Sequence, residues 1–300
     1  MNRQEPALDS DEDADLSDVD FGNRRWKFIL QRFHHNLIGL IGLVLVAGVA
    51  ATAILAPLIA THNPVSQNSQ ALIQPMTDGH LLGTDHLGRD IFSRLVYGAR
   101  YALLIGLGAV FVSGGIGVTL GTIGGYFGGL ADRAVMRLVD IFLGIPVLVL
   151  AMAISGILGG GLRNIIIAVG VAGWARFARL TRGETVSIKE NEYIEAAVNS
   201  GTSHSKIIVR HVLPNAVGPI VVYGSLYIAS AILWSAALSF LGLGAQPPTP
   251  VWGAMIGQGR DYLTTAWWIA TLPGLAITIT VLGFNFFGDG IRDSIDPRQR

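Results

Sequence analysis

The sequence predicts an all-α, polytopic membrane protein with six transmembrane helices, and three observations lead to this fold class. Hydrophobic residues make up 51% of the 300-residue chain and charged residues only 14%, whereas soluble domains carry about 25% charged residues. The apolar residues gather in runs close to the ~20 residues that a helix needs to cross the hydrocarbon core. The 38 glycines, many of them inside these runs, suit helices that pack closely within a membrane.

Charged residues decide which apolar runs count as spans. The fourth run contains Arg176 and Arg179, whose side chains would have to extend toward the membrane surface. We count it as a span because most of the 21 lysines and arginines then lie on the side that holds both termini, as the positive-inside rule requires. Asp140 in the third span is expected near that surface, paired with Arg133 or Arg137. In chain order, the expected spans are residues 37–60, 101–126, 135–158, 164–180, 217–243 and 268–287.

The chain begins with an acidic stretch. Residues 1–23 carry eight acidic residues and one arginine, a composition that predicts a disordered tail. Its acidic start is also unlike that of a secretory signal peptide. The predicted organisation is a cytosolic tail at 1–23, a first transmembrane helix with an extracytoplasmic segment at 24–100, and a transmembrane domain at 101–300.

Two patterns predict helices around the second span. Ile91, Phe92 and Leu95 form an apolar face, which predicts a short helix on the membrane surface. Within the second span, Gly117 and Gly121 begin a spacing of four that continues at residue 125 and predicts a seam for close helix packing. A nucleotide-binding loop is a poor interpretation of these glycines, because no strand precedes them.

The most polar stretch of the membrane domain is EAAVNSGTSHSKIIVRHVLP, at residues 195–214. Its two alanines favour a helix, which Gly201 can end by adopting a positive φ. Thr202 or Ser203 can cap a second helix, and Pro214 would stop it. Two short helices with apolar faces, joined by a glycine hinge, are suited to dock against a protein outside the lipid.

The spacing EAA-x3-G-x11-LP in this stretch resembles the signature loop of the permease subunits of ABC importers. In that family the loop carries the coupling helix, which sits in a groove of a cytosolic ATPase. The resemblance implies that residues 181–215 form a coupling loop, with polar contacts from its glutamate at the base. The residues expected to couple to the ATPase are Glu195, Ala196, Ala197, Gly201, Leu213 and Pro214.

Three further stretches are similar to one branch of that family, the C-type permease subunit of dipeptide and oligopeptide ABC importers. The resemblance covers about residue 24 to the end. The stretches are LGTD and LGRD at 82–85 and 87–90, SFLGLG and PPTP at 239–244 and 247–250, and GD, RD and DP at 288–289, 292–293 and 296–297.

This resemblance implies a type I ABC importer fold and a permease that translocates di- or oligopeptides by alternating access. It implies a second related permease subunit, one or two cytosolic ATPases and an extracytoplasmic binding protein or lipoprotein as partners, and no nucleic acid. ATP and Mg²⁺ would bind the ATPases, because this chain has no Walker loop and no cofactor is expected on it. The expected location is the bacterial inner membrane, with several passes and both termini in the cytoplasm.

Two alternatives to peptide transport stay open. The subfamily includes permeases for nickel chelates and glutathione, so the cargo could be one of these or another small solute. An ion-coupled secondary transporter is less favoured, because it would usually place ionisable residues at mid-membrane. We expect no catalytic residue, since the sequence contains no HExxH or GxSxG motif.

Charged residues of the extracytoplasmic segment have two interpretations. Asp85, Arg89, Asp90 and Arg94 could form a docking surface for the binding protein or an external gate, together with Trp252. They could equally pair with one another, in which case exposed pairs would contribute only ~0–1 kcal/mol.

Other polar residues are weaker candidates. Trp234, Ser235 and Asn285 could line a translocation path, although helix packing explains them equally well. We expect no metal site, because His34 and His35 lie at the opposite end of the first span from the histidine at position 62.

Overall fold

The computed structural model describes residues 33–34, 36–67 and 70–295, so the predicted acidic tail lies outside the described residues. Within them every regular element is a helix, as predicted. In chain order these are α2 (Leu37–Ile54), α3 (Ala56–Ile59), α4 (Ile91–Phe127), α5 (Gly129–Leu143), α6 (Val147–Leu158), α7 (Leu162–Lys189), α8 (Glu192–Asn199), α9 (His204–Ile207), the π-helix η2 (Ile208–Val212), α10 (Leu213–Phe240), α11 (Trp252–Gly259), the 3₁₀-helix η3 (Arg260–Tyr262) and α12 (Trp268–Ile295).

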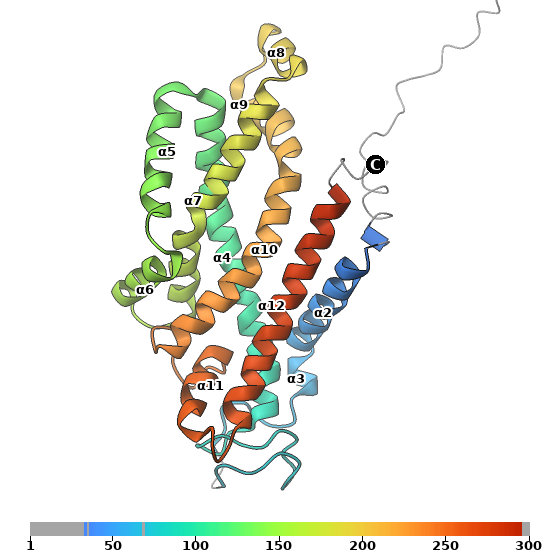
Figure 1. Ribbon diagram of the computed structural model, residues 1–300, viewed down its shortest axis with the longest axis vertical. Helices are drawn as coiled ribbons and strands as arrows, with labels where there is room; N and C mark the ends of the chain where they lie inside the picture. Colours follow the sequence, from blue (N-terminus) through green and yellow to red (C-terminus); the bar gives the residue numbers. More distant parts are fainter. Residues whose placement is uncertain (1–32, 35, 68–69, 296–300) are drawn as a thin grey trace, which may run out of the picture.

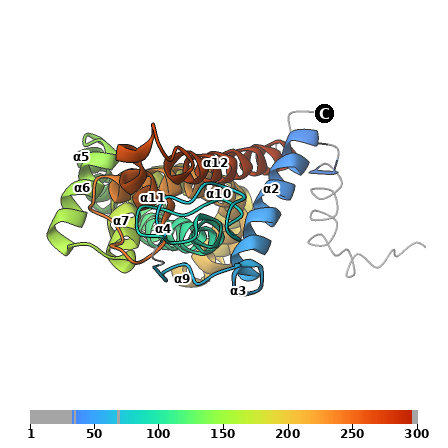
Figure 2. The ribbon, with the colours of Figure 1, turned by 90° about the horizontal axis from the view of Figure 1, so that it is seen from below.

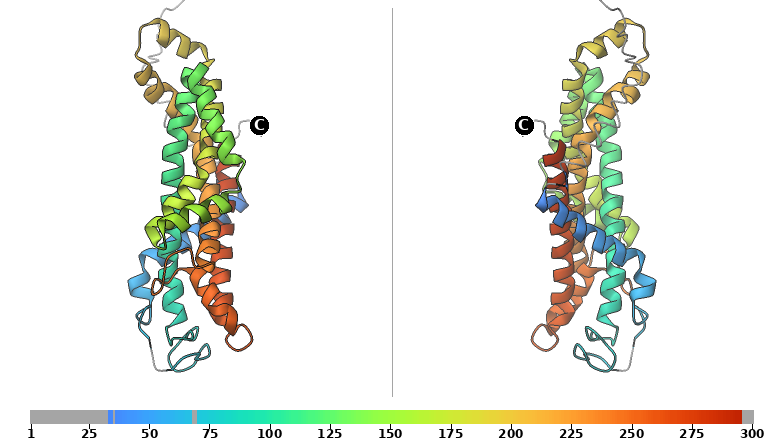
Figure 3. Two further views of the ribbon diagram at one scale, coloured as in Figure 1. Left: turned by 90° about the vertical axis from the view of Figure 1, so that its left-hand side faces the viewer. Right: turned by 90° about the vertical axis from the view of Figure 1, so that its right-hand side faces the viewer.

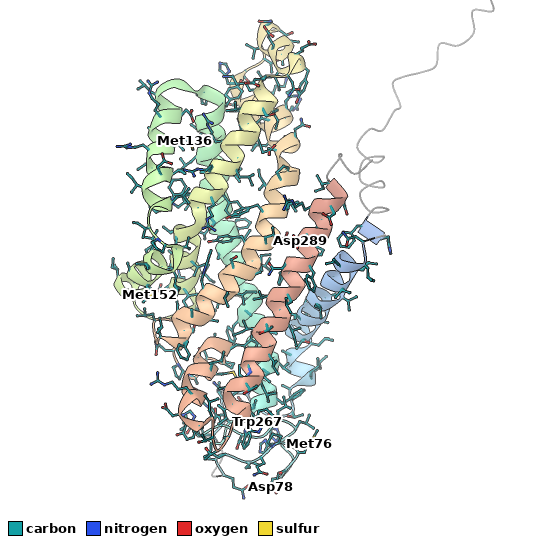
Figure 4. All side chains as sticks on the ribbon, in the orientation of Figure 1. Met76, Asp78, Met136, Met152, Trp267 and Asp289 are labelled. Carbon is teal, nitrogen blue, oxygen red and sulfur yellow. The ribbon has the colours of Figure 1, made fainter. Side chains whose placement is uncertain are left out.

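The long helices α4, α7, α10 and α12 form the body of an elongated molecule, and α2 packs along α12 (Figures 1 and 2). The segment at residues 61–90 closes one end, and α8 with α9 projects at the other (Figure 3). Met76 and Asp78 mark the tip of the 61–90 end in Figure 4. The start of α2 and the end of α12 lie together, because the Asn36 side chain donates to the Asp293 carboxylate at 2.8 Å.

The described residues contain fewer plain membrane spans than the six predicted. Four helical stretches are long and apolar enough to cross a membrane, namely α2, α4, α9 to α10, and α12. The pair α5 and α6 would add a fifth crossing, but the two helices meet at 90°. The expected span at 135–158 is therefore not one continuous helix but a bent pair. Pro146 precedes α6 and has no amide hydrogen to continue α5.

The predicted fourth span falls within α7, a helix of 28 residues that continues to Lys189. This helix contacts α4, α5, α6 and α10, so neighbouring helices cover much of its surface. Arg182 forms two hydrogen bonds to Asp132 of α5, at 2.9 and 2.7 Å. Because neighbouring helices supply partners for its arginines, α7 need not be as apolar as a lipid-facing helix.

A second ion pair joins the same two helices. Asp140 of α5 accepts a hydrogen bond from Arg179 of α7. The expected pairing of Asp140 with Arg133 or Arg137 is therefore wrong, because the approach of α7 brings a third arginine closer than the two on the same helix.

The longest helix, α4, has 37 residues and begins earlier than the predicted second span. Asp90 is its N-cap, and the Asp90 carboxylate accepts the Ser93 amide at 2.8 Å. Residues 91–96 are therefore the first turns of α4 and not the separate surface helix that we expected. The predicted division between residues 100 and 101 falls inside this helix.

The glycine seam predicted in the second span is confirmed. Gly117, Gly121 and Gly125 are buried and face α7, where a Cβ atom on any of them would overlap its backbone or side chains. At Gly121 the obstructing atoms are the carbonyl oxygen of Ala178 and, at 3.0 Å, Thr181 Cβ. The two helices therefore approach at backbone distance along this face.

Replacing Gly121 by alanine is expected to force α4 and α7 apart and to lower the free energy of unfolding by about 1–3 kcal/mol, as overpacking does. Thermal unfolding of the purified chain in detergent measures this. Gly115→Ala is the matched control, because a Cβ there meets nothing within 4 Å and alanine favours the helix by ~1 kcal/mol. Equal melting temperatures for the two variants would contradict a close seam.

Candidate functional site

The predicted coupling loop at 181–215 is built from the ends of two long helices with short helices between them. Residues 181–189 are the last turns of α7, and α8, α9 and η2 follow. Leu213 begins α10, so Pro214 lies in the first turn of that helix. The expectation that Pro214 stops the second short helix is therefore wrong. A proline at this position breaks no helical hydrogen bond, because the first amides of a helix lack intrahelical partners.

Gly201 ends α8 as predicted. It has a φ of +74°, and its amide donates to the Val198 carbonyl at 2.9 Å while the Thr202 amide donates to the Ala197 carbonyl at 3.1 Å. This pair of bonds is the Schellman pattern that ends a helix on a residue with left-handed φ. Ser203 occupies the N-cap of α9, but its side chain makes no capping hydrogen bond.

A small apolar core holds the loop against the bundle. Ile194 of α8, Ile207 of α9 and Val212 of η2 are buried against Tyr126 and Ile188. These last two residues lie at the ends of α4 and α7. The coupling loop is therefore packed onto the two helices that share the glycine seam.

Polar contacts strengthen the same attachment. The Lys189 ammonium donates to the Tyr126 carbonyl at 2.7 Å, and the Tyr126 hydroxyl lies 2.9 Å from His204 Nδ1. Both contacts converge on the last turn of α4. They leave the loop little freedom to move independently of that helix.

The outer face of the loop carries apolar side chains that the described part of the chain does not cover. Tyr193 is 46% exposed and Val209 is 63% exposed. Glu195 and Ala196 are also exposed. The Glu195 carboxylate makes no hydrogen bond with the described residues, so the polar contacts implied at the base of the loop stay a prediction. An exposed apolar face on a firmly attached loop is suited to receive another protein.

At the opposite end, the charged residues are buried. Arg89 is 1% exposed, and its Nε donates to Asp85 Oδ2 at 2.7 Å while its Nη2 donates to Gln258 of α11 at 2.8 Å. Arg94 Nη1 donates to the Pro64 carbonyl at 3.1 Å. The predicted pairing of these residues with one another is confirmed for Asp85 and Arg89, but the pair is buried and not exposed. These groups fasten the 61–90 segment to the bundle and present little charge for docking.

Two tryptophans complete this attachment. Trp252 Nε1 donates to the Leu95 carbonyl at 3.0 Å, and Trp268 Nε1 donates to the Thr84 carbonyl at 3.1 Å. Both indoles are buried. Trp252, a candidate for the external gate, is thus packed against the first turns of α4, and a role in gating stays a prediction.

The candidate path residues are distributed over two helices. Ser235 is buried and donates to the Ile232 carbonyl of its own helix at 2.8 Å. Trp234 is half-buried, with its ring 5.6 Å from that of Tyr227. Asn285 is half-buried on α12. Helix packing accounts for the first two, and a role in translocation stays a prediction for all three.

One cluster was missed by sequence reasoning. His62 and His80 lie beside Asp90, and their possible ligand atoms are within 4.8 Å of one another. The sequence pattern separates His62 from the histidines at the other end of the first span and gives no sign of a nearer partner. Nothing in the spacing of residues 62, 80 and 90 indicates that the 61–90 segment folds back on itself.

Comparisons with known proteins agree with the geometry. A family model described as "Binding-protein-dependent transport system inner membrane component" matches residues 117–300. A second model, the N-terminal TM domain of oligopeptide transport permease C, matches residues 24–75. The chain is 41% identical over 275 residues to the Dipeptide transport system permease protein DppC of Alkalihalophilus pseudofirmus, covering 92% of this chain and 90% of that protein.

Two other similarities bear on cargo and fold. The chain is 46% identical over 224 residues to the Glutathione transport system permease protein GsiD of Pectobacterium atrosepticum, covering 75% of this chain and 74% of that one. A solved structure of the inward-facing MetNI methionine ABC transporter aligns with a TM-score of 0.55 at 21% identity, over 69% of this chain and 98% of that chain. The predicted type I ABC importer permease fold is thereby confirmed.

Replacing Arg89 by methionine is expected to lower the free energy of unfolding by about 3 kcal/mol or more, because it leaves a buried carboxylate without its main partner. Thermal unfolding of the purified chain measures the change. Arg260→Met is the control, since the Arg260 side chain is 61% exposed and pairs only with its neighbour Asp261. If both substitutions had the same small effect, the Asp85 pair would not hold this end together.

Proposed function

This chain belongs to the family of binding-protein-dependent transport system inner membrane components, and on that premise we propose that it moves di- or oligopeptides across a bacterial inner membrane. It is a permease subunit of an ABC importer and not an enzyme. The observation that carries the proposal is the coupling loop, which is anchored to α4 and α7 on one side and presents an uncovered apolar face on the other.

Four kinds of partner complete the proposed importer. One or two cytosolic ATPases dock on the exposed face of α8 and α9, and these chains bind ATP and Mg²⁺. A second related permease subunit lies alongside. An extracytoplasmic binding protein or lipoprotein delivers the peptide at the end of the molecule formed by residues 61–90. The coupling residues are proposed to be Glu195, Ala196, Ala197, Gly201, Leu213 and Pro214.

This assignment fixes the orientation of the chain. The coupling loop faces the cytoplasm, together with both termini, and the 61–90 segment faces outward. The hydrogen bond between Asn36 and Asp293 supports the placement of both termini on one side, since it joins the start of α2 to the end of α12. The coupling loop and the 61–90 segment lie at opposite ends of the molecule (Figure 1). This separation supports placing them on opposite sides of the membrane.

The proposed mechanism is alternating access driven from the coupling loop. When the ATPases close on ATP, they push α8, and the buried contacts of Ile194 and Ile207 pass this movement to α4 and α7. A switch from 1:99 to 99:1 between two states requires about 5.5 kcal/mol of differential interaction. A loop with its own buried core can pass this free-energy difference to the membrane helices. A mobile connector would instead move without displacing them.

Peptide uptake tests the proposed cargo. We expect proteoliposomes that hold the complete importer and enclose ATP to accumulate a labelled dipeptide only when the matching binding protein is present. Glutathione and a nickel chelate are tested in parallel, because the family resemblance leaves them open. Accumulation of either of these without dipeptide uptake would contradict the peptide assignment but leave the importer mechanism standing.

Replacing Gly201 by valine is expected to lower the uptake per ATP hydrolysed while the subunit still inserts and assembles. A β-branched residue at a φ of +74° is strained by about 1–3 kcal/mol, so the end of α8 should shift relative to the bundle. Uptake and hydrolysis are measured on the same proteoliposomes.

Gly159→Val is the matched control for this substitution. Gly159 has a φ of +79° and open space around it, but it lies between α6 and α7, away from the coupling loop. We expect its ratio of uptake to hydrolysis to equal that of the wild type. A wild-type ratio in the Gly201 variant would contradict the coupling role.

A further inference from the structure

Three potential metal ligands from separate parts of the 61–90 segment meet in one place. His62 follows α3, His80 lies in the turn after Met76, and Asp90 is the N-cap of α4. His80 Nδ1 lies 2.8 Å from Asp90 Oδ1, and His62 Nδ1 lies 3.7 Å from the same oxygen. The two imidazole rings are stacked, with centroids 4.5 Å apart.

Other contacts hold these three groups in position. Asp90 Oδ2 accepts the Ser93 amide at 2.8 Å and the Thr61 hydroxyl at 3.4 Å, so Oδ1 is left facing the imidazoles. The His62 amide donates to Ser93 Oγ at 2.9 Å.

We propose that His62, His80 and Asp90 form a binding site for a divalent transition-metal ion of the zinc type. Two imidazole nitrogens and one carboxylate oxygen are a ligand set that zinc takes in proteins, with water in the fourth position. Bonds of about 2.0–2.1 Å in a tetrahedral site place neighbouring ligand atoms roughly 3.3 Å apart. The observed separations of 2.8 and 3.7 Å lie on either side of that value.

A metal ion can reach and occupy this position with small movements. His80 and Asp90 are buried, whereas the His62 side chain is 42% exposed and opens the site to solvent. The ion would bond to His80 Nδ1 and Asp90 Oδ1, and the neutral imidazole would then carry its one proton on Nε2. Three bonds to the ion then join the chain after α3, the turn at residue 80 and the first turn of α4.

Zinc binding by the full-length, tag-free chain in detergent tests the proposal. We expect isothermal titration with zinc chloride to give one site per chain, and cobalt(II) to give the visible absorption of a tetrahedral complex. His62→Gln removes a ligand at a partly exposed position, and Asp90→Asn removes the charge while keeping a capping oxygen. Each should weaken zinc binding by at least about tenfold, since even residues that only support metal ligands have effects of 10–100-fold.

His211→Gln is the matched control, because His211 lies on η2 at the far end of the molecule. Its zinc affinity and cobalt spectrum should equal those of the wild type. The proposal is overturned if the wild type binds no zinc, or if His62→Gln and His211→Gln bind it equally. These measurements do not involve transport, so they stand or fall independently of the proposed cargo.

Discussion

Close packing of α4 against α7 is the contact on which the rest of the structure depends. Three glycines spaced by four let the two backbones touch, and a methyl group at Gly121 would separate them. Beyond this seam, the last turn of α4 carries Tyr126, which packs against the coupling loop. At its other end, α4 begins at Asp90, where the 61–90 segment is fastened by buried charges. Both ends of the molecule are thus attached to one pair of helices.

Each end of the molecule is attached to the helix bundle by buried groups. These groups are polar at one end and apolar at the other. The pair of Asp85 with Arg89 joins the 61–90 segment to α11 through Gln258, and Ile194 with Ile207 joins the coupling loop to the bundle. Neither attachment relies on solvent-exposed ion pairs, which contribute little. In the proposed mechanism such firm attachment is needed, because movement of α8 has to reach the membrane helices.

Features with a local physical cause could be predicted from the sequence. The helical class, the glycine seam and the turn at Gly201 follow from composition, spacing and backbone preference. Contacts between distant residues could not be predicted. The partner of Asp140 depends on where α7 lies, the burial of Arg89 depends on α11, and the meeting of His62 with His80 depends on the path of an irregular loop. The right-angle break between α5 and α6 could not be predicted because the uncharged run of residues 141–158 continues across Pro146.

An uninterrupted helix of 37 residues spans about 55 Å at 1.5 Å per residue, and this length has a thermodynamic consequence. If a molecule that binds at the Asp90 end and another that binds near Tyr126 each prefer one tilt of α4, each changes the affinity of the other. Linkage requires the reverse effect to be equal in size. In the proposed importer, the binding protein and the ATPases would therefore change each other's affinity for the permease by the same factor.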